Sequence, residues 1–327
     1  MRHGPNAATA RAYSNIALIK YWGKRDSALN LPAVGSISIT LDALYTDTRV
    51  TFVSGLEQDK IEIGGRTTDP ARFTGFLDRI RQHADITARA RVESWNNFPT
   101  GAGLASSASG FAALALAATQ AAGLNLSPRE LSILARQGSG SAARSIFGGY
   151  AEMHRGERDD GTDAFAEPLL DADAWPLDVV VAITATTSKS VNSTTGMQDL
   201  DQRSDYYDAW VGHAETDLAA MREAIEDRDF ARLGALSEMS CLKLHGLMLS
   251  TRPGLIYWNA ATVAAMHAVR QLRADGVGVY FTIDAGPQVK AVCQPADTDR
   301  VVAALEQVPG VLEARRSGLG PAAHRLD

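Results

Sequence analysis

The chain has 327 residues, which is too long for one hydrophobic core, so two domains are expected. Hydrophobic residues make up 45% and charged residues 21%, which is an ordinary globular composition. Its formal net charge of −6 gives no basic footprint for nucleic acid, and the isolated Cys241 and Cys293 argue against a disulfide framework or a structural zinc site. Residues 1–15 hold no apolar run and no stretch reaches membrane-spanning length, so we expect a cytoplasmic protein without a membrane partner.

The first half of the chain begins with strands and continues with helices. Residues 49–53 and 60–63 read as strands bounded by turn formers. Residues 104–122 are an almost unbroken run of Ala, Leu and Ser followed by Gly123, which predicts a buried helix with a glycine cap. The pattern Ser-Pro-Arg-Glu at 127–130 predicts the start of another helix. The acidic, glycine-rich stretch 155–163 predicts a solvated loop.

The second half predicts a smaller α+β unit. Residues 177–183 read as a buried strand, and we place the domain boundary there, giving domains 1–183 and 184–327. Two amphipathic helices follow, and a helix at 259–274 then leads into an alternating strand at 277–284. A strand at 289–293, a helix near 297–308 and a final strand complete the unit. This order of helices and strands is typical of an α+β sandwich.

A candidate phosphate loop precedes the long buried helix. Gly101 and Gly103 let the backbone approach a ligand, and Ser106, Ser107 and Ser109 add hydroxyls at the helix start. The amino terminus of a helix carries free N–H groups and a partial positive charge, which suit a triphosphate. The Gly-Lys-Ser/Thr element of a Walker A loop is missing. Taken alone, the segment is equally well read as a Gly/Ser turn that caps a core helix.

Two other segments combine cations with glycine or apolar residues. Lys20, Lys24 and Arg25 follow an apolar run that should be buried, so Lys20 needs an anionic partner there. Residues 138–149, GSGSAARSIFGG, place Arg144 among glycines and serines, and a guanidinium can bind a carboxylate through two hydrogen bonds. The plain alternatives are a solvated end of a strand and a glycine-rich turn.

Two segments of the second half supply further polar groups. Residues 187–197, TSKSVNSTTGM, form a polar loop of a kind that often has no ligand. Asp284 ends an apolar strand and precedes Ala-Gly-Pro, which puts a carboxylate where a strand meets a cleft. A turn-forming aspartate is the plain alternative.

Five segments in order resemble one family. The motif Pro-x-x-x-Gly-Leu-Ala-Ser-Ser-Ala at 99–108 resembles the ATP-binding loop of the GHMP superfamily, and its core is most similar to the diphosphomevalonate decarboxylase branch. The match continues through residues 14–26, 138–149, 187–197 and 280–288, over nearly the whole chain. The resemblance implies an amino-terminal domain with the ribosomal protein S5 domain 2 fold, a ferredoxin-like carboxy-terminal domain, a cleft between them, and a homodimer.

The resemblance also implies residue roles. Arg144 holds the carboxylate that leaves as carbon dioxide, Lys189 lies near the transferring phosphoryl group, and Asp284 orients or deprotonates the tertiary hydroxyl. Residues that contact the substrate phosphates are Lys20, Tyr21, Lys24, Ser139, Ser141 and Ser193, with Trp22 shaping the pocket. Residues that bind ATP are Pro99, Gly101, Gly103, Leu104, Ala105, Ser106, Ser107 and Ser109, with Ser107 also at Mg²⁺.

The implied reaction converts mevalonate 5-diphosphate to isopentenyl diphosphate with ATP and Mg²⁺. Three alternatives stay open: decarboxylation of mevalonate 5-monophosphate, a small-molecule kinase that stops after phosphorylation, and an inactive metabolite sensor. Asp284 and Arg144 together argue against the kinase, since a simple kinase has no need to bind a carboxylate. The presence of Asp284 and of the serines of the phosphate loop argues against the sensor. The chain departs from the common family pattern at Val34 and Gly35, where relatives often have Asn-Ser, at Asn192, where proline is frequent, and at Gly101, where alanine is usual.

Overall fold

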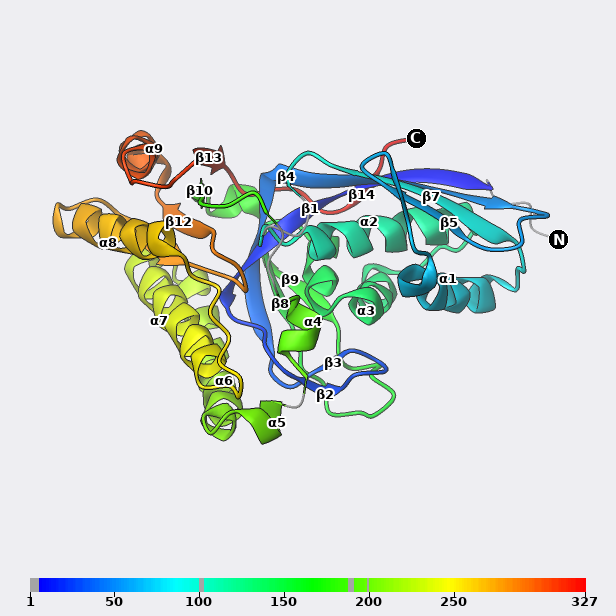
Figure 1. Ribbon diagram of the computed structural model, residues 1–327, viewed down its shortest axis with the longest axis horizontal. Coiled ribbons are helices and arrows are strands. Elements are labelled where there is room, and N and C mark those ends of the chain that lie inside the picture. The colour runs from blue at the N-terminus through cyan, green and yellow to red at the C-terminus, as the bar shows by residue number, and fades with distance from the viewer. Residues whose placement is uncertain (1–5, 100–102, 188–190, 199) are drawn as a thin grey trace.

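The computed structural model describes residues 6–99, 103–187, 191–198 and 200–327. Two large β-sheets with helices packed against them form most of the described molecule, and these two sheets meet along a shared core (Figure 1). This arrangement confirms the α+β class predicted from the sequence. No helix in the described part of the chain has the length and apolar character needed to cross a bilayer.

The first sheet is organised around two long antiparallel strands, β1 (Ala7–Ile19) and β4 (Ser36–Val53). Every residue of β1 from Ala12 to Ile19 is buried, so the carboxyl half of this strand is covered on both faces. The other strands of the sheet are β5 (Lys60–Ile63), β6 (Arg66–Thr68), β7 (Arg89–Asn96), β8 (Tyr150–Met153), β9 (Ala166–Leu170) and β14 (His324–Arg325).

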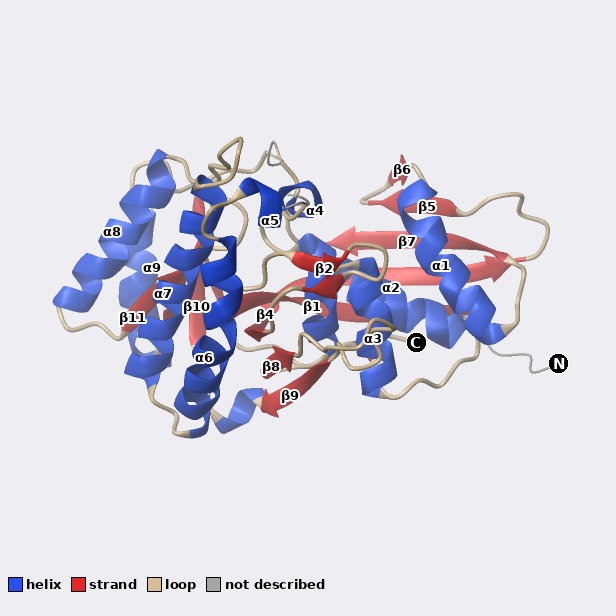
Figure 2. Cartoon of the chain, turned by 90° about the horizontal axis from the view of Figure 1, so that it is seen from below, coloured by secondary structure: helices blue, strands red, loops and turns tan. Residues whose placement is uncertain are grey.

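Three helices cover one face of this sheet (Figure 2): α1 (Ala71–Ala84), α2 (Ser106–Ala121) and α3 (Pro128–Gly138). α2 lies against β1 and β4, and its alanines and leucines are buried on nearly every side because α3 and α1 cover it. The residue Gly123 follows α2 with φ 74°, and Ser127 and Glu130 form the capping box of α3, as predicted.

The second sheet has the strand order β11 (Val279–Thr282), β12 (Val289–Cys293), β10 (Asp178–Ile183) and β13 (Glu313–Ser317). Because β10 pairs with β12 and β13, the segment that our division at 183 assigns to the first domain lies in the second sheet. The division itself stays a prediction. The helices of this half are α6 (Tyr207–Glu226), α7 (Phe230–Leu249), α8 (Ala260–Ala274) and α9 (Thr298–Glu306).

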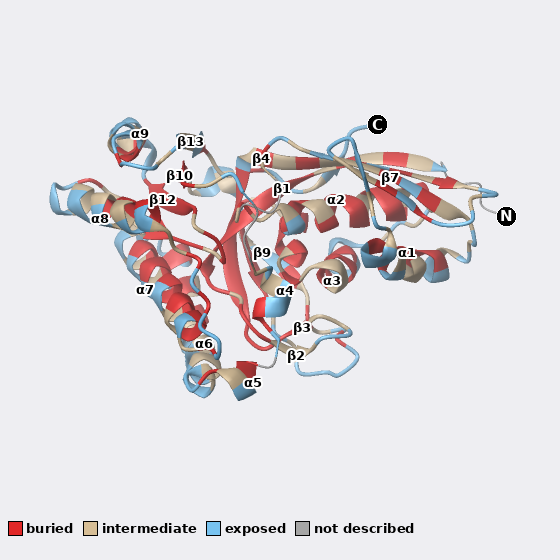
Figure 3. Cartoon of the chain, in the orientation of Figure 1, coloured by how far each residue is buried: buried red, intermediate tan, exposed pale blue. Residues whose placement is uncertain are grey.

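A continuous core joins the two halves. Ile16 and Leu18 of β1 pack in one cluster with Val179 and Val181 of β10 and with Leu218 of α6. Figure 3 shows buried residues concentrated where the long strands meet the second sheet. Short elements border this junction: the β2 (Lys24–Asp26) and β3 (Leu31–Pro32) hairpin, the 3₁₀ helix η1 (Gly140–Ile146), and the helices α4 (Ser193–Gly196) and α5 (Leu200–Arg203).

Candidate active site

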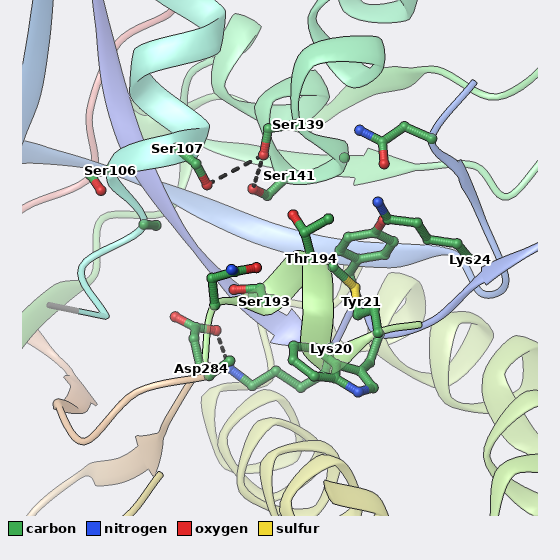
Figure 4. Close-up of a pocket in the computed structure, with 18 of the residues that line it drawn as sticks. Lys20, Tyr21, Lys24, Ser106, Ser107, Ser139, Ser141, Ser193, Thr194 and Asp284 are labelled. Carbon is green, nitrogen blue, oxygen red and sulfur yellow. Dashed lines mark hydrogen bonds and ion pairs between the residues drawn. The ribbon is translucent and has the colours of Figure 1, made fainter. Parts of the chain in front are cut away.

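A cavity of about 580 Å³ opens at the junction of the two halves (Figure 4). Its walls come from β1 and the segment after it, the start of α2, the turn between α3 and η1, the α4 segment and the loop after β11. The sequence-predicted residues that line it are Lys20, Tyr21, Trp22, Lys24, Gly103, Ala105, Ser106, Ser107, Ser139, Ser141, Arg144, Ser193 and Asp284. The fold therefore brings together residues from all five motif segments.

The loop before α2 has the shape of an anion site. Gly103 and Ala105 adopt left-handed conformations, with φ 84° and 57°, and for alanine this conformation is strained. Ala105 is also the N-cap residue of α2, and its methyl group supplies no side-chain cap. An uncapped helix start leaves N–H groups and positive partial charge for another acceptor. The loop thus suits a phosphate group.

Three side chains predicted to bind ATP lie away from this cavity: those of Pro99, Leu104 and Ser109. Leu104 is buried in the core that joins the two halves. The hydroxyl of Ser109 is fully buried and lies 2.7 Å from the hydroxyl oxygen of Thr46. Since Ser109 comes two residues after Ser107, it is on the opposite side of the helix and faces the sheet. Gly101 lies outside the described residues.

The carboxylate of Asp284 lies between two buried lysines. Its Oδ1 accepts a hydrogen bond from Lys20 Nζ at 2.7 Å, and its Oδ2 lies 3.2 Å from Lys290 Nζ. Burial alone would raise the pKa of the Asp284 carboxyl, but the two ammonium groups hold it well below its usual range. Asp284 is therefore ionised at neutral pH, and the anionic partner that the sequence requires for Lys20 is this carboxylate.

The guanidinium of Arg144 is buried, and its hydrogen bonds go to neutral groups. It donates to Asn15 Oδ1 at 3.1 Å and to the hydroxyl of Ser36, and its Nε has no partner. Among the described residues no carboxylate forms an ion pair with it, although Arg144 is only 2% exposed. Burial lowers the pKa of Arg144 to about 10, against a smaller opposing effect of the Asp284 carboxylate, so Arg144 stays protonated at neutral pH. A buried cation in this state favours an anionic ligand.

Serine hydroxyls and one tyrosine line the wall between the loop and Arg144. Ser139 Oγ lies 3.3 Å from Ser107 Oγ and 3.4 Å from Ser141 Oγ. A Cβ atom at Gly140 would lie 2.5 Å from the hydroxyl oxygen of Tyr21, so glycine is required there. Burial raises the pKa of Tyr21 to about 12, which keeps its hydroxyl available as a donor.

Lys24 lies across the cavity from Asp284 (Figure 4). Burial lowers the pKa of its ammonium group, and no neighbouring carboxylate in the described part of the chain offsets that effect. The α4 segment faces it with Ser193 and Thr194. Lys24 is therefore a second cation of the cavity that an anionic ligand would neutralise.

A smaller cavity of about 100 Å³ adjoins the start of α2. It is lined by aliphatic and aromatic side chains, among them Ile61, Ile63 and Phe111. Arg72, Ser106 and Ser107 line both cavities. An apolar recess beside a phosphate-type loop is suited to the base of a nucleotide.

Several residues of the site escaped the sequence reasoning. Asn15 and Ser36 hold Arg144, Arg72 links the two cavities, and Lys290 contacts Asp284. A charged residue within the apolar run 289–293 is the one available signal for Lys290. Lys189, predicted to lie near the transferring phosphoryl group, is outside the described residues. No cluster of three His, Cys, Asp or Glu side chains suited to a metal occurs in the described ranges.

Comparison with known proteins identifies the family. A family model for the diphosphomevalonate decarboxylase-like N-terminal domain matches residues 12–166, and one for the mevalonate 5-diphosphate decarboxylase C-terminal domain matches residues 179–317. The chain belongs to the diphosphomevalonate decarboxylase family. These two matches cover most of both halves and leave the strand β14 outside.

Individual relatives agree with this assignment. A diphosphomevalonate decarboxylase of Gibberella zeae is 36% identical over 325 residues, covering 92% of this chain and 84% of the relative. A phosphomevalonate decarboxylase of Haloferax volcanii is 34% identical and covers 98% of both chains. The solved structure of MDDEF in complex with MVAPP, AMPPCP and magnesium superposes with a TM-score of 0.91 at 41% identity, covering 98% of this chain and 99% of the other.

Proposed function

We propose that the chain catalyses the ATP-dependent decarboxylation of mevalonate 5-diphosphate to isopentenyl diphosphate, ADP, phosphate and carbon dioxide. The observation that carries this proposal is Arg144, a buried cation held only by neutral groups in the cavity that also contains the ionised Asp284. A kinase that stops after phosphorylation has no use for a buried carboxylate-binding arginine. A decarboxylase needs both groups in one cavity.

The chemistry explains why ATP is required. A 3-hydroxy acid has no electron sink for the carboxylate electrons, so carbon dioxide leaves only if C3 carries a leaving group. Transfer of the γ-phosphoryl group to the tertiary hydroxyl creates one: the O–P bond forms and ADP departs. Phosphate then leaves with the C3–O electrons, the bond to the carboxylate breaks, and its electrons form the alkene. Such a reaction depends on positioning and charge neutralisation.

Asp284 suits the role of orienting the hydroxyl. With two ammonium groups on it, this carboxylate is a weak base, so strong proton abstraction before phosphoryl transfer is not its contribution. A loose phosphoryl-transfer transition state needs an acceptor that aligns the nucleophile, and the hydroxyl proton can leave late. Arg144 would meanwhile hold the substrate carboxylate through its guanidinium fork.

The residues at the start of α2 fit ATP with Mg²⁺. The left-handed turn at Gly103 and Ala105, the uncapped helix start and the hydroxyl of Ser107 provide donors for a triphosphate, and the smaller cavity suits the base. Because no carboxylate cluster is present in the described ranges, the ion would be held by the phosphates and the Ser107 hydroxyl. Bound there, Mg²⁺ neutralises charge on the phosphates.

The substrate tail is the point on which the proposal is tested. By the family resemblance, the diphosphate would be bound by residues that all line the cavity: Lys20, Tyr21, Lys24, Ser139, Ser141 and Ser193. Lys20 is paired with Asp284 in the structure, so Lys24 is the lysine of this set that is free within the described part of the chain. The resemblance also assigns Lys189 to the transferring phosphoryl group. The relative from Haloferax volcanii makes the monophosphate the second candidate. Lys24 favours the diphosphate, because it adds an unneutralised cation at the end of the cavity opposite Asp284.

The deciding experiment measures ADP and carbon dioxide with ATP and Mg²⁺, offering the two phosphates of mevalonate separately. Equal amounts of both products with the diphosphate support the proposal, preference for the monophosphate makes the second candidate correct, and ADP without carbon dioxide indicates a kinase. In the same assay we expect Lys24→Met to raise KM for the diphosphate about 10-fold or more, with kcat less affected. An unchanged KM contradicts the role of Lys24.

The homodimer and the cytoplasmic location rest on the family resemblance and the composition. We propose a twofold dimer, which is the commonest symmetry of soluble oligomers. Sedimentation equilibrium at several protein concentrations tests it, since a molar mass close to that of one 34.9 kDa chain would exclude the dimer.

A further inference from the structure

Lys290 is a buried cation to which the mechanism above gives no contact with the substrate or with ATP. It lies on β12, between β11 and β10 in the second sheet, and its side chain is 1% exposed. Burying an ammonium group in a central strand is unfavourable unless the charge is neutralised. A lysine at this position therefore needs a reason beyond packing.

Neutralisation of Asp284 is not a sufficient reason. Lys20 already contacts Oδ1 at 2.7 Å and is itself buried, so the pair Lys20–Asp284 is neutral without a second lysine. Adding Lys290 leaves two cations on one carboxylate. Within the described residues, no other carboxylate forms an ion pair with Lys290. The excess positive charge lies beside the phosphate loop.

The second contact of Lys290 explains its position. Its ammonium group donates to the backbone carbonyl of Gly103 at 3.0 Å. The same loop touches the turn after Asp284, because a Cβ atom at Gly103 would lie 3.0 Å from the Cα of Gly286. The phosphate loop and the Asp284 turn, which are far apart in sequence and belong to different halves, therefore meet at Lys290.

We propose that Lys290 is a positioning residue that joins the Asp284 carboxylate to the phosphate loop through the Gly103 carbonyl. This inference rests on the proposed function, in which the hydroxyl beside Asp284 attacks the phosphoryl group held by that loop. A single ammonium group that contacts both partners fixes their separation. In-line transfer is sensitive to that separation, since a displacement of about 1 Å can cost roughly 10²-fold in rate.

The contact has an electrostatic consequence that a purely structural lysine would not have. The positive charges of Lys20 and Lys290 together lower the pKa of Asp284, against the opposing effect of burial. Removing Lys290 leaves one of the two charges, so the Asp284 pKa rises. An NMR titration of the Asp284 carboxyl group measures this rise directly, because it follows proton uptake by the carboxylate itself.

Three variants test the proposal. Lys290→Met removes the charge but keeps an unbranched apolar side chain in the buried site, and Lys290→Arg keeps the charge. Lys243→Met is the matched control, because it removes a lysine whose ion pair with Asp217, at 2.7 Å, lies outside the cavity. Thermal unfolding of each variant shows which of them are folded.

The first readout combines turnover by the wild-type protein and each variant with an NMR titration of the Asp284 carboxyl group. For Lys290→Met we expect kcat to fall about 10-fold or more, and we expect Asp284 to take up its proton at higher pH than in the wild-type protein. Lys290→Arg should return the titration toward the wild-type position, and Lys243→Met should change neither quantity. A folded Lys290→Met protein with unchanged kcat or with an unshifted Asp284 titration overturns the proposal.

The second readout needs no turnover and separates the two proposals. Binding of a non-hydrolysable ATP analogue with Mg²⁺, measured by calorimetry, should weaken several-fold in Lys290→Met, because the Gly103 loop loses its anchor. Unchanged affinity overturns the link to the loop. If wild-type protein binds the analogue but releases no carbon dioxide from the diphosphate, the proposed function fails while the link between Lys290 and the loop is still measured.

Discussion

Three buried cations at the candidate site fall into two groups that have different partners. Lys20 and Lys290 share the carboxylate of Asp284, which neutralises one of their two positive charges within the protein. Arg144 has only the amide oxygen of Asn15 and the hydroxyl of Ser36. Since an isolated buried charge is costly, the second arrangement is expected where a ligand brings the counter-charge. In the proposed reaction, the first group would orient the hydroxyl and the second would bind the carboxylate.

Substitution of Arg144 should uncouple the two products. In Arg144→Met the carboxylate clamp is lost while Asp284 and the phosphate loop keep their contacts, so carbon dioxide release should fall by roughly 10²-fold or more. ADP release should fall less, because phosphoryl transfer does not use the clamp directly. Parallel assays of ADP and carbon dioxide measure the difference.

Asp284→Asn provides the comparison, since it should reduce both products together. Arg144→Lys keeps the charge but not the planar fork and should recover little of the lost decarboxylation. Equal loss of ADP and carbon dioxide in Arg144→Met, matching Asp284→Asn, would contradict the assigned division of roles.

His245 on α7 should make the protein less stable in acid. It is 2% exposed, its Nε2 has no partner, and its ring lies 4.6 Å from that of Trp258. Burial, with help from the charges of Lys20 and Lys290, lowers the pKa of His245 from 6.5 to about 3. The depressed value means that its contribution to stability is present above pH 6.5 and is lost as pH falls toward 3.

Urea unfolding at several pH values measures this effect. One such histidine changes the free energy of unfolding by at most about 1.4 kcal/mol per pH unit. We expect His245→Phe to flatten the loss of unfolding free energy between pH 6.5 and 3, and His213→Gln, at an exposed position on α6, to leave it unchanged. An unchanged slope in His245→Phe would show that this histidine titrates normally in the folded protein.

At the scale of elements, the packing of α2 against α3 sets the turn that carries Ser139 and Ser141. Gly138, the last residue of α3, lies so close to Phe111 of α2 that a Cβ there would be 2.1 Å from its Cδ1. Phe111 is itself packed between Phe73 and Phe76 of α1, so it has little room to move. The glycine therefore determines how closely the serine turn approaches the phosphate loop.

Gly138→Ala should accordingly lower both stability and activity. Overpacking of this kind costs about 1–3 kcal/mol, and displacement of the serine turn should raise KM for the substrate. Gly212→Ala is the control: no atom lies within 4 Å of its added Cβ on α6, and alanine in place of a helical glycine should stabilise by about 0.5–1 kcal/mol. Denaturant unfolding of both variants shows whether the free energy of unfolding falls in Gly138→Ala and rises in Gly212→Ala. An unchanged free energy of unfolding in Gly138→Ala would refute the packing argument.

Short sequence patterns predicted some elements well because these elements depend only on residues that are neighbours in the chain. The capping box at Ser127 and Glu130 and the strand at 289–293 depend on neighbouring residues, and both are found where the sequence puts them. The direction of Ser109 and the sheet to which β10 belongs depend on partners far along the chain. No short-range pattern contains that information.

The same limit applies to the candidate site. The motif segments converge as expected, because each carries a residue type unusual for its surroundings, such as a lysine after an apolar strand. The pairing of Lys20 with Asp284 joins residues 264 positions apart, so sequence reasoning could require an anion for Lys20 without naming it. Arg72 has no such signal, since an arginine on a helix surface is ordinary.

At the scale of the whole molecule, the departure at Gly35 from the common family pattern has a packing explanation. Gly35 directly precedes β4 and Ser36, the residue that holds Arg144. A Cβ at this position would lie 2.8 Å from Cδ1 of Leu218, on α6 of the second half, and 3.1 Å from the carbonyl oxygen of Met153. Leu218 is 2% exposed and belongs to the core shared by the two halves. Glycine here allows α6 to approach the first sheet.

This contact predicts that the two halves are energetically coupled through positions 35 and 218. Restoring the family's usual serine with Gly35→Ser should destabilise by about 1–3 kcal/mol, because the side chain meets Leu218, and Leu218→Ala alone should cost about 2–5 kcal/mol. The double variant should cost less than the sum, since the smaller side chain at 218 makes room for the serine. A double-mutant cycle in urea unfolding should give a coupling energy of about 0.5–3 kcal/mol.

The cycle also connects packing with the site. If α6 sets the position of Ser36 through this contact, Gly35→Ser should disturb the hydrogen bond from Arg144 and lower carbon dioxide release, and Leu218→Ala in the same chain should restore part of it. Strict additivity in both stability and turnover would mean that the serine is accommodated without touching α6. Coupling in stability without recovery of turnover would confine the contact to packing between the halves and leave the position of Arg144 independent of it.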